Sequence, residues 1–392
     1  MLPERCQRLA GLFFSIGELW RTTRRFTVSS MRNLGMGKKM IEGKIFEELH
    51  FLIEMIKSFK GEPFSLTSFN CAPINITFIM LFGDRFDYKD PTFLTLLRLI
   101  DEVMNLLGSP YLNIMLGKIE DVRVILRQYI KASREDINEN SVRSYIDALI
   151  FKQQEEKNKK DSLFHDDNLI ASILDLVMAG TETIATTLQW AILLMMKYPE
   201  IQKKVQEEIG RTVKAGSWAT YEDRKNMPFT NAVLHEVQRF ITLLPHVPRC
   251  TAVDTHFRGY FLPKGIIVIP SLTSVLLDKT QWETPHQFNP NHFLDAEGNF
   301  VKREAFLPFS TADKGNLESP AFGIWDSKPD DWEVWKSIHQ AQKVQVAGNN
   351  LSRVQQGKEQ GLEDDTTFVS NIAPQVKKRS TLQNHPLPEA QN

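Results

Sequence analysis

Cysteine is scarce in this sequence of 392 residues. Its three cysteines, Cys6, Cys71 and Cys250, are far apart and none has C-x-x-C spacing. A disulfide framework needs several paired cysteines, and a structural zinc site needs ligands at short spacing. The sequence therefore favours neither, and indicates isolated thiols in a reducing compartment.

An excess of charge of one sign is also missing. The 47 Lys and Arg residues nearly balance the 48 Asp and Glu residues, which leaves a net charge of -1. Without a positive field to attract a phosphate backbone, we expect no nucleic-acid partner. The hydrophobic content of 42% nevertheless allows a substantial buried core at this length.

The first twenty residues contain no long hydrophobic run. The mostly apolar stretch between Leu9 and Leu19 is interrupted by polar residues and a glycine. It is far shorter than the roughly 20 residues that a membrane-spanning helix needs. Glu18 and Arg21 stand where a signal peptide would have a small-residue cleavage site. We therefore expect no transmembrane anchor in this chain.

Amphipathic helical patterns dominate the sequence from Trp20 to Phe240. Apolar residues recur at intervals of three and four in the segments 39–59, 96–107 and 119–137. A longer apolar segment at 169–196 follows Asp166 and Asp167, which favour a helix N-terminus. A helix of that length would extend about 45 Å, enough to cross a domain core.

Short β-like runs separated by proline and glycine replace the helical pattern after Phe240. In FRGYFLPKGIIVIPS, at 257–271, a Pro263-Lys264-Gly265 turn lies between two such runs. The sequence therefore predicts a mainly α fold with a small β element (α+β).

The composition changes again at Thr311, where polar residues become abundant and aliphatic residues few. Such a segment cannot bury enough apolar surface to offset the entropy lost on ordering. We expect residues 1–310 to form the folded domain and residues 311–392 a divergent polar tail that is largely disordered.

The pentapeptide AGTET, Ala179 to Thr183, is unusual inside the long apolar helix. Gly180 costs about 1 kcal/mol relative to alanine in a helix interior, and Glu182 is surrounded by residues that favour burial. One interpretation is a site where a planar ligand approaches the backbone and Glu182 and Thr183 relay protons. The other is a helix kink from which Glu182 reaches solvent or a salt bridge.

Three further patterns are weak when each is taken alone. In LHEVQRF, Glu236 and Arg239 share a helix face, a spacing most often seen in solvated ion pairs. Trp20 and Arg24, in WRTTRRF, place two hydrogen-bond donors four residues apart, which suits a ligand with carboxylates. The last pattern is FNPNHFLD, a proline-containing turn that includes His292.

The order and spacing of these patterns resemble the heme-thiolate monooxygenases, the cytochrome P-450 family, and especially its microsomal branch. The resemblance extends over about residues 11–310 and includes FGDRFDY at 82–88 and the G-Y-x-x-P-K-G turn. It implies a partial cytochrome P-450 fold that lacks the N-terminal sheet region, the proximal cysteine loop and the C-terminal elements.

The resemblance implies heme as the cofactor and assigns residues to it. Trp20, Arg24 and Arg249 match the residues that hold the heme propionates. Thr183, with Glu182 before it, matches the distal catalytic pair that delivers protons during oxygen activation.

The same resemblance implies that Glu236, Arg239 and His292 form a buried structural group behind the heme. The segments 173–179 and 242–247 match substrate-lining positions, and their apolar content suits a lipophilic small molecule such as a xenobiotic or a fatty acid. The family's partner is an NADPH-dependent reductase, and its location is the cytosolic face of the endoplasmic reticulum membrane. We expect this chain to be cytoplasmic or peripherally associated with the membrane.

The sequence departs from the family at the proximal loop, F-x-x-G-x-R-x-C-x-G, whose cysteine is the iron ligand. Counted from Phe309, Ala312, Lys314 and Asn316 stand in place of the glycine, arginine and cysteine. Neither Cys250, beside Arg249, nor His339 is a suitable substitute, because the first lies on the propionate side and the second lacks the electron-donating thiolate. We expect no metal ligand and an inactive chain. The alternative is a non-catalytic splice product or gene-model fragment with at most a partner-binding or competitive role.

Overall fold

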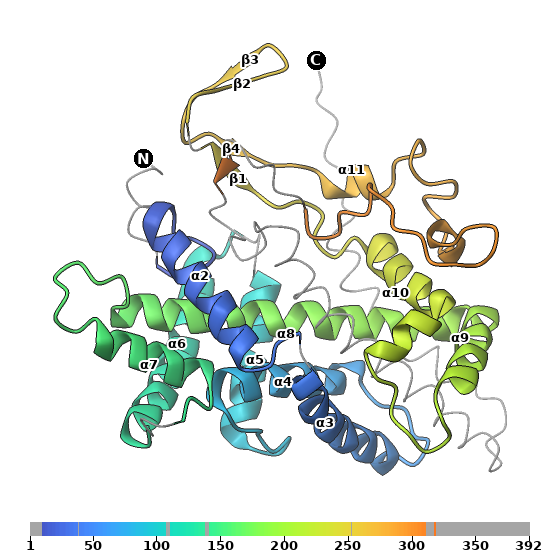
Figure 1. The fold of residues 1–392 in the computed structure, drawn as a ribbon, viewed down its shortest axis with the longest axis horizontal. Helices are drawn as coiled ribbons and strands as arrows, with labels where there is room; N and C mark the ends of the chain where they lie inside the picture. Colours follow the sequence, from blue (N-terminus) through green and yellow to red (C-terminus); the bar gives the residue numbers. More distant parts are fainter. Residues whose placement is uncertain are drawn as a thin grey trace.

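The computed structural model describes residues 10–37, 39–106, 110–137, 141–251 and 253–310, together with the backbone of Leu317–Glu318. Helices form most of this structure, and short strands lie together at one side (Figure 1). The predicted mainly α fold with a small β element is confirmed.

The helix α8 (Asp166–Lys197) is the longest element and runs through the middle of the helical body (Figure 1). The ring of His165 caps its first turn by accepting the backbone N–H of Asn168 at 3.3 Å, and Asp166 and Asp167 follow there, as expected. Among the described helices, α8 alone has the length and apolar composition of a membrane span, but 72% of its most apolar window is buried inside the protein. Such burial is typical of the core helix of a globular domain.

The short helix α4 (Cys71–Phe82) is apolar on all sides and lies against α8. A helix without a polar face can be stable only where other elements surround it. The 3-10 turn η1 (Leu66–Asn70) precedes it, and α3 (Lys39–Ser58) and α7 (Tyr145–Glu155) pack against it. The rings of Phe78 and Phe82 on α4 contact α5 (Pro91–Leu106) and α6 (Leu112–Glu135), and α2 (Gly17–Asn33) packs against α7. The helices expected over 39–59, 96–107 and 119–137 correspond to α3, α5 and α6.

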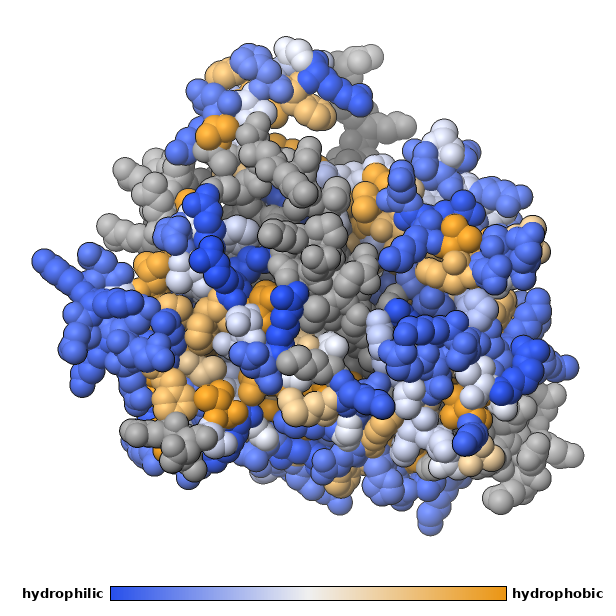
Figure 2. Space-filling view, viewed as in Figure 1, coloured by the Kyte–Doolittle hydropathy of each residue, from blue (hydrophilic) through white to orange (hydrophobic). Residues whose placement is uncertain are grey.

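The carboxyl half of α8 packs against two further helices, α9 (Pro199–Thr212) and α10 (Pro228–Ile241). Their contact surface is a separate cluster of buried apolar side chains that includes Leu194, Val205 and Val237. The turn η2 (Glu222–Asn226) connects α9 to α10. Figure 2 shows mainly hydrophilic residues with smaller hydrophobic patches on the surface in view, whereas the apolar cluster between these helices is buried.

Two small antiparallel sheets follow α10. One has the strand order β4 (Ile267–Val268), β1 (Arg249–Thr251), β5 (Leu317–Glu318), and the other pairs β2 (Thr255–Phe257) with β3 (Tyr260–Leu262). The short helix α11 (Leu272–Leu276) and the turn η3 (Pro290–Phe293) complete the described elements.

The turn of the β2–β3 hairpin is Arg258-Gly259, where both residues have positive φ, 48° and 87°. This combination is typical of the type I′ turn that joins tightly paired strands. The Pro263-Lys264-Gly265 turn instead leads from β3 into β4, which pairs with β1. The sequence therefore indicated the runs that contain β3 and β4 and the turn between them, but neither β1 nor the pairing of the strands.

Candidate functional site

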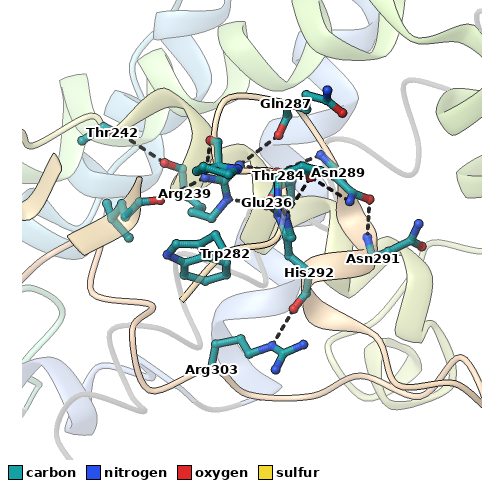
Figure 3. A network of polar contacts seen from close by, with 12 residues as sticks. Glu236, Arg239, Thr242, Trp282, Thr284, Gln287, Asn289, Asn291, His292 and Arg303 are labelled. Carbon is teal, nitrogen blue, oxygen red and sulfur yellow. Dashed lines mark hydrogen bonds and ion pairs between the residues drawn. The ribbon is translucent and has the colours of Figure 1, made fainter. Parts of the chain in front are cut away.

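Arg239 and Glu236 form a buried ion pair on α10 (Figure 3). The guanidinium donates from Nε to Glu236 Oε2 at 2.7 Å and from Nη2 to Oε1 at 2.6 Å, and both side chains are 0% exposed. Its other N–H groups donate to the carbonyl oxygens of Leu276, Pro285 and Gln287 at 2.8–3.0 Å. All five guanidinium donors are therefore used. This is not the solvated ion pair that the spacing alone would favour.

His292 of η3 lies on the other side of the Glu236 carboxylate, with Nδ1 3.1 Å from Oε2. Its Nε2 accepts the backbone N–H of Thr284 at 3.2 Å, so in the neutral ring the proton is on Nδ1 and is donated to Glu236. The backbone N–H of Asn289 also donates to Glu236, at 2.8 Å. One carboxylate thus links α10 to the segment 284–292.

Trp282 covers this network on one side. Its ring centroid is 5.2 Å from the guanidinium carbon of Arg239, and its indole Nε1 donates to the carbonyl oxygen of Val275 at 3.0 Å. The indole is buried with Phe293 and Ala232 in a small apolar cluster. The polar groups of Arg239 and Glu236 are all hydrogen-bonded, an arrangement suited to holding α10 against the segment 284–292.

Glu182 and Thr183 lie next to each other in the middle of α8, and both are partly buried. The hydroxyl of Thr183 donates to the carbonyl oxygen of Ala179 at 2.7 Å, one turn earlier in the helix. The hydroxyl of Thr186 donates to Glu182 Oε1 at 3.1 Å. Both groups can exchange protons, and local hydrogen bonds hold them in place.

Gly180 is explained by helix packing. A Cβ atom at this position would lie 2.8 Å from Oγ1 and 3.1 Å from Cγ2 of Thr77, on α4. The absence of a side chain lets the two helices approach closely. Neither a ligand nor a kink is needed to account for the glycine itself.

Trp20 and Arg24 lie one turn apart on α2, and the guanidinium carbon is 5.7 Å from the indole centroid. The Nε1 atom of Trp20 is buried and has no hydrogen-bond partner among the described residues. Arg249 begins strand β1 and is 4% exposed. The three predicted cofactor-binding donors thus come from two elements that are far apart in the sequence.

A buried acidic residue, Glu48 on α3, was not predicted from the sequence. It accepts hydrogen bonds from Arg85 Nε at 2.7 Å, from Asn75 Nδ2 at 3.3 Å and from the hydroxyl of Tyr88. Burial raises the pKa of Glu48 to about 7, although these three donors lower it. The FGDRFDY motif therefore binds α3 through Arg85 and Tyr88. The sequence signal that could have indicated this site was a glutamate at an otherwise apolar helix position.

A second unpredicted acidic residue, Asp175, lies on α8 five residues before Gly180. Its Oδ2 accepts the backbone N–H groups of Leu12 and Phe13 at 2.6 and 3.0 Å, and burial raises the pKa of Asp175 to about 7. The nearby Asn168 accepts the N–H of Gly11 at 2.8 Å. These bonds attach the segment before α2 to the helix expected to line a substrate site. The only sequence signal that could have indicated this site was an aspartate within an apolar helix.

The residues predicted to hold heme propionates fit a heme in part. A buried indole N–H that has no acceptor among the described residues, together with two arginines, matches what the carboxylates of a heme require. The described residues contain no cluster of three or more His, Cys, Asp or Glu side chains that could hold a metal ion. Asn316, at the expected ligand position, lies outside the described residues. The sequence offers no thiolate there.

Comparison with known proteins gives a consistent result. The family model described as Cytochrome P450 matches residues 4–312. The chain is 54% identical to Cytochrome P450 2W1 of Homo sapiens over 321 residues, which cover 78% of this chain and 65% of that protein. It is 51% identical to the 2W1 protein of Mus musculus and 42% identical to Cytochrome P450 2K4 of Oncorhynchus mykiss, covering 65% and 63% of those proteins. The chain therefore spans just under two thirds of these relatives.

Proposed function

Because the chain belongs to the cytochrome P450 family, we propose that it is a catalytically silent relative of the heme-dependent monooxygenases that oxidise lipophilic small molecules. The observation that carries the proposal is Asn316 in the place of the iron-ligating cysteine. A thiolate ligand pushes electron density toward the bond that the family breaks, and a neutral amide supplies no such push.

The other candidate ligands do not replace that cysteine. Cys250 belongs to β1, where it is paired with Ile267 on one side and Glu318 on the other. It directly follows Arg249, one of the proposed propionate donors, so moving it to the opposite face of a heme would require unfolding the strand. His339 would supply an imidazole instead of a thiolate, and lies outside the described residues.

In this proposal the heme-binding residues are Trp20, Arg24 and Arg249, which would donate hydrogen bonds to the propionates. Heme, when bound in this family, supplies the chemistry of oxygen activation. Glu182 and Thr183 would hold and move protons at their carboxylate and hydroxyl oxygens, which the partial burial of both side chains supports.

A second candidate function is an active monooxygenase that receives electrons from an NADPH-dependent reductase. The presence of donors on the propionate side and of the Glu182–Thr183 pair favours it. If the chain is silent, its remaining role is to bind a partner or to compete for the reductase, as a splice product or gene-model fragment would. Its proposed location is the cytoplasm or, through peripheral association, the endoplasmic reticulum membrane.

The test is spectroscopic. The full chain is mixed with hemin, reduced and exposed to carbon monoxide, with the full-length human relative as a positive control. We expect no strongly red-shifted Soret band, because that band requires a thiolate ligand. A matched variant carrying Ala312→Gly, Lys314→Arg and Asn316→Cys tests whether the replaced residues are the cause. A thiolate-type band from the unmodified chain would overturn the proposal.

A further inference from the structure

Strand β1 is the central strand of its sheet, although its two neighbours come from very different parts of the sequence. On one edge, Arg249 and Cys250 lie opposite Val268 and Ile267 of β4. On the other edge, Cys250 and Thr251 lie opposite Glu318 and Leu317 of β5. Strand β5 therefore belongs to the segment after Ser310, where the resemblance to the family ends.

The β4 edge of β1 is fixed without any contribution from that segment. The backbone N–H of Thr251 donates to the carbonyl oxygen of Ile266 at 3.0 Å, and its carbonyl oxygen accepts the N–H of Gly265 at 2.9 Å. Its hydroxyl donates to the carbonyl oxygen of Pro263 at 2.6 Å and accepts the N–H of Ile266 at 3.0 Å. One residue thus holds the turn that leads into β4.

The opposite edge of β1 has a different requirement. Arg249 and Thr251 are 4% and 2% exposed, so this strand is largely removed from water. Backbone N–H and C=O groups in such a place need partners, and an unpaired strand edge is also a template for pairing with other chains. A strand that occupies this edge both satisfies the backbone and blocks such pairing.

We propose that Leu317–Glu318 is a strand supplied by the chain itself to close the free edge of β1. The mode is strand addition, in which backbone hydrogen bonds supply the attraction and side-chain identity is secondary. Two residues would bind weakly from a separate molecule, but only residues 311–316 separate β5 from the buried Ser310. So short a connection gives the strand a high effective concentration at its site. The inference does not depend on heme binding.

Cys250 allows a direct test, because it is native to β1 and lies opposite Glu318. Directly opposed residues of antiparallel strands have Cα atoms about 4.5–5.5 Å apart, within the range found in disulfides. The full chain carrying Glu318→Cys is oxidised mildly, and peptide mass spectrometry identifies the cross-linked cysteines. We expect a high yield of the disulfide that joins Cys250 to the introduced thiol.

The matched control is Gln345→Cys, which adds one thiol to the same polar segment. We expect its disulfide with Cys250 to form at least about tenfold less, because its effective concentration falls with chain separation. Equal yields in the two variants, or no disulfide in Glu318→Cys, would overturn the proposal.

Hydrogen exchange gives a second, independent measurement on the full chain. The double substitution Leu317→Pro/Glu318→Pro removes both N–H groups of β5, and Val344→Pro/Gln345→Pro is its control. We expect the first variant alone to exchange about tenfold faster at the amide of Cys250, which faces β5, while the amide of Thr251, which donates to Ile266 on the other edge, and α8 stay protected. Unchanged exchange at β1 would contradict the inference. If α8 also loses protection, the proline variant is unfolded beyond the sheet, and the disulfide yields then decide whether β5 pairs with β1.

Discussion

Thr77 of α4 donates a hydrogen bond to the carbonyl oxygen of Gly180 on α8, with Oγ1 and O 3.3 Å apart. The same hydroxyl lies 3.0 Å from the carbonyl oxygen of Pro73 in its own helix. One threonine thus bridges α4 and α8, at the glycine that makes AGTET unusual for a helix interior. The contact sets how closely α4 and α8 approach each other.

The substitution Gly180→Ala should destabilise the protein. Alanine is favoured over glycine in a helix by about 1 kcal/mol, but the new Cβ would lie 2.8 Å from Thr77 Oγ1, and overpacking typically costs about 1–3 kcal/mol. We expect a net loss of up to about 2 kcal/mol in the free energy of unfolding, measured by denaturant titration. Adding Thr77→Ala should recover most of it.

Gly210→Ala on α9 is the control for this experiment, because nothing lies within 4 Å of the added Cβ. It should increase stability by about 0.5–1 kcal/mol through helix propensity alone. If Gly180→Ala behaved like Gly210→Ala, the steric account of Gly180 would be wrong.

Arg239→Ala should be among the most destabilising single substitutions in the chain. It leaves the carboxylate of Glu236 buried without its cation and removes the donors to three carbonyl oxygens, a change that typically costs about 3–5 kcal/mol. Lys57→Ala is a matched control with the same spacing, because Lys57 pairs with Glu54 at 2.7 Å while both are more than half exposed. Its loss should stay below about 1 kcal/mol. Thermal unfolding measures the loss of stability in both variants. Similar losses would contradict the prediction that the buried pair matters far more than the exposed one.

The pKa of Asp175 predicts how stability depends on pH. Burial raises it from 3.8 in the unfolded chain to about 7 in the folded protein, despite the two backbone N–H donors and the charge of Arg123. The folded state therefore binds the proton more tightly. The contribution of Asp175 to the free energy of unfolding is fully present below pH 4 and is lost as the pH rises to about 7. The free energy of unfolding falls by at most about 1.4 kcal/mol per pH unit in this range.

Asp175→Asn should remove this part of the pH dependence. Both backbone N–H donors bind Oδ2, so the amide oxygen of asparagine can accept them without carrying a charge. We expect the variant to match the unmodified protein near pH 4 and to exceed its stability at pH 8, in urea titrations at both values. Part of the slope should remain, because burial also raises the pKa of Glu48 to about 7. A variant with the full slope would show that Asp175 does not titrate in this range.

Trp20→Phe should cost little stability in the protein without heme. The substitution deletes a buried N–H that has no acceptor among the described residues, and the loss of packing is offset by removing an unsatisfied donor. Trp282→Phe is the comparison, since its indole donates to Val275 at 3.0 Å, and it should cost about 1–3 kcal/mol more. Titration with hemin should show weaker binding for Trp20→Phe. Equal losses of stability in the two variants would contradict the assignment.

The sequence by itself determined the helices and the order of the motifs. The apolar period at 39–59 reflects the burial of one helix face, and the apolar run at 169–196 reflects a helix in the core. From these patterns α3 and α8 could be placed within a few residues. The proposal that Asn316 stands in the place of a proximal cysteine likewise rests on the sequence alone.

The tertiary structure alone decided which polar groups meet. Asp175 and Leu12 are separated by 163 positions and Glu48 and Arg85 by 37, and no period in the sequence encodes such a pairing. The partner of β1 beyond Ser310 was hidden for the same reason, because strand addition depends on backbone hydrogen bonds more than on side-chain pattern. Local patterns determine which face of an element is buried, whereas its contacts depend on how the whole chain packs.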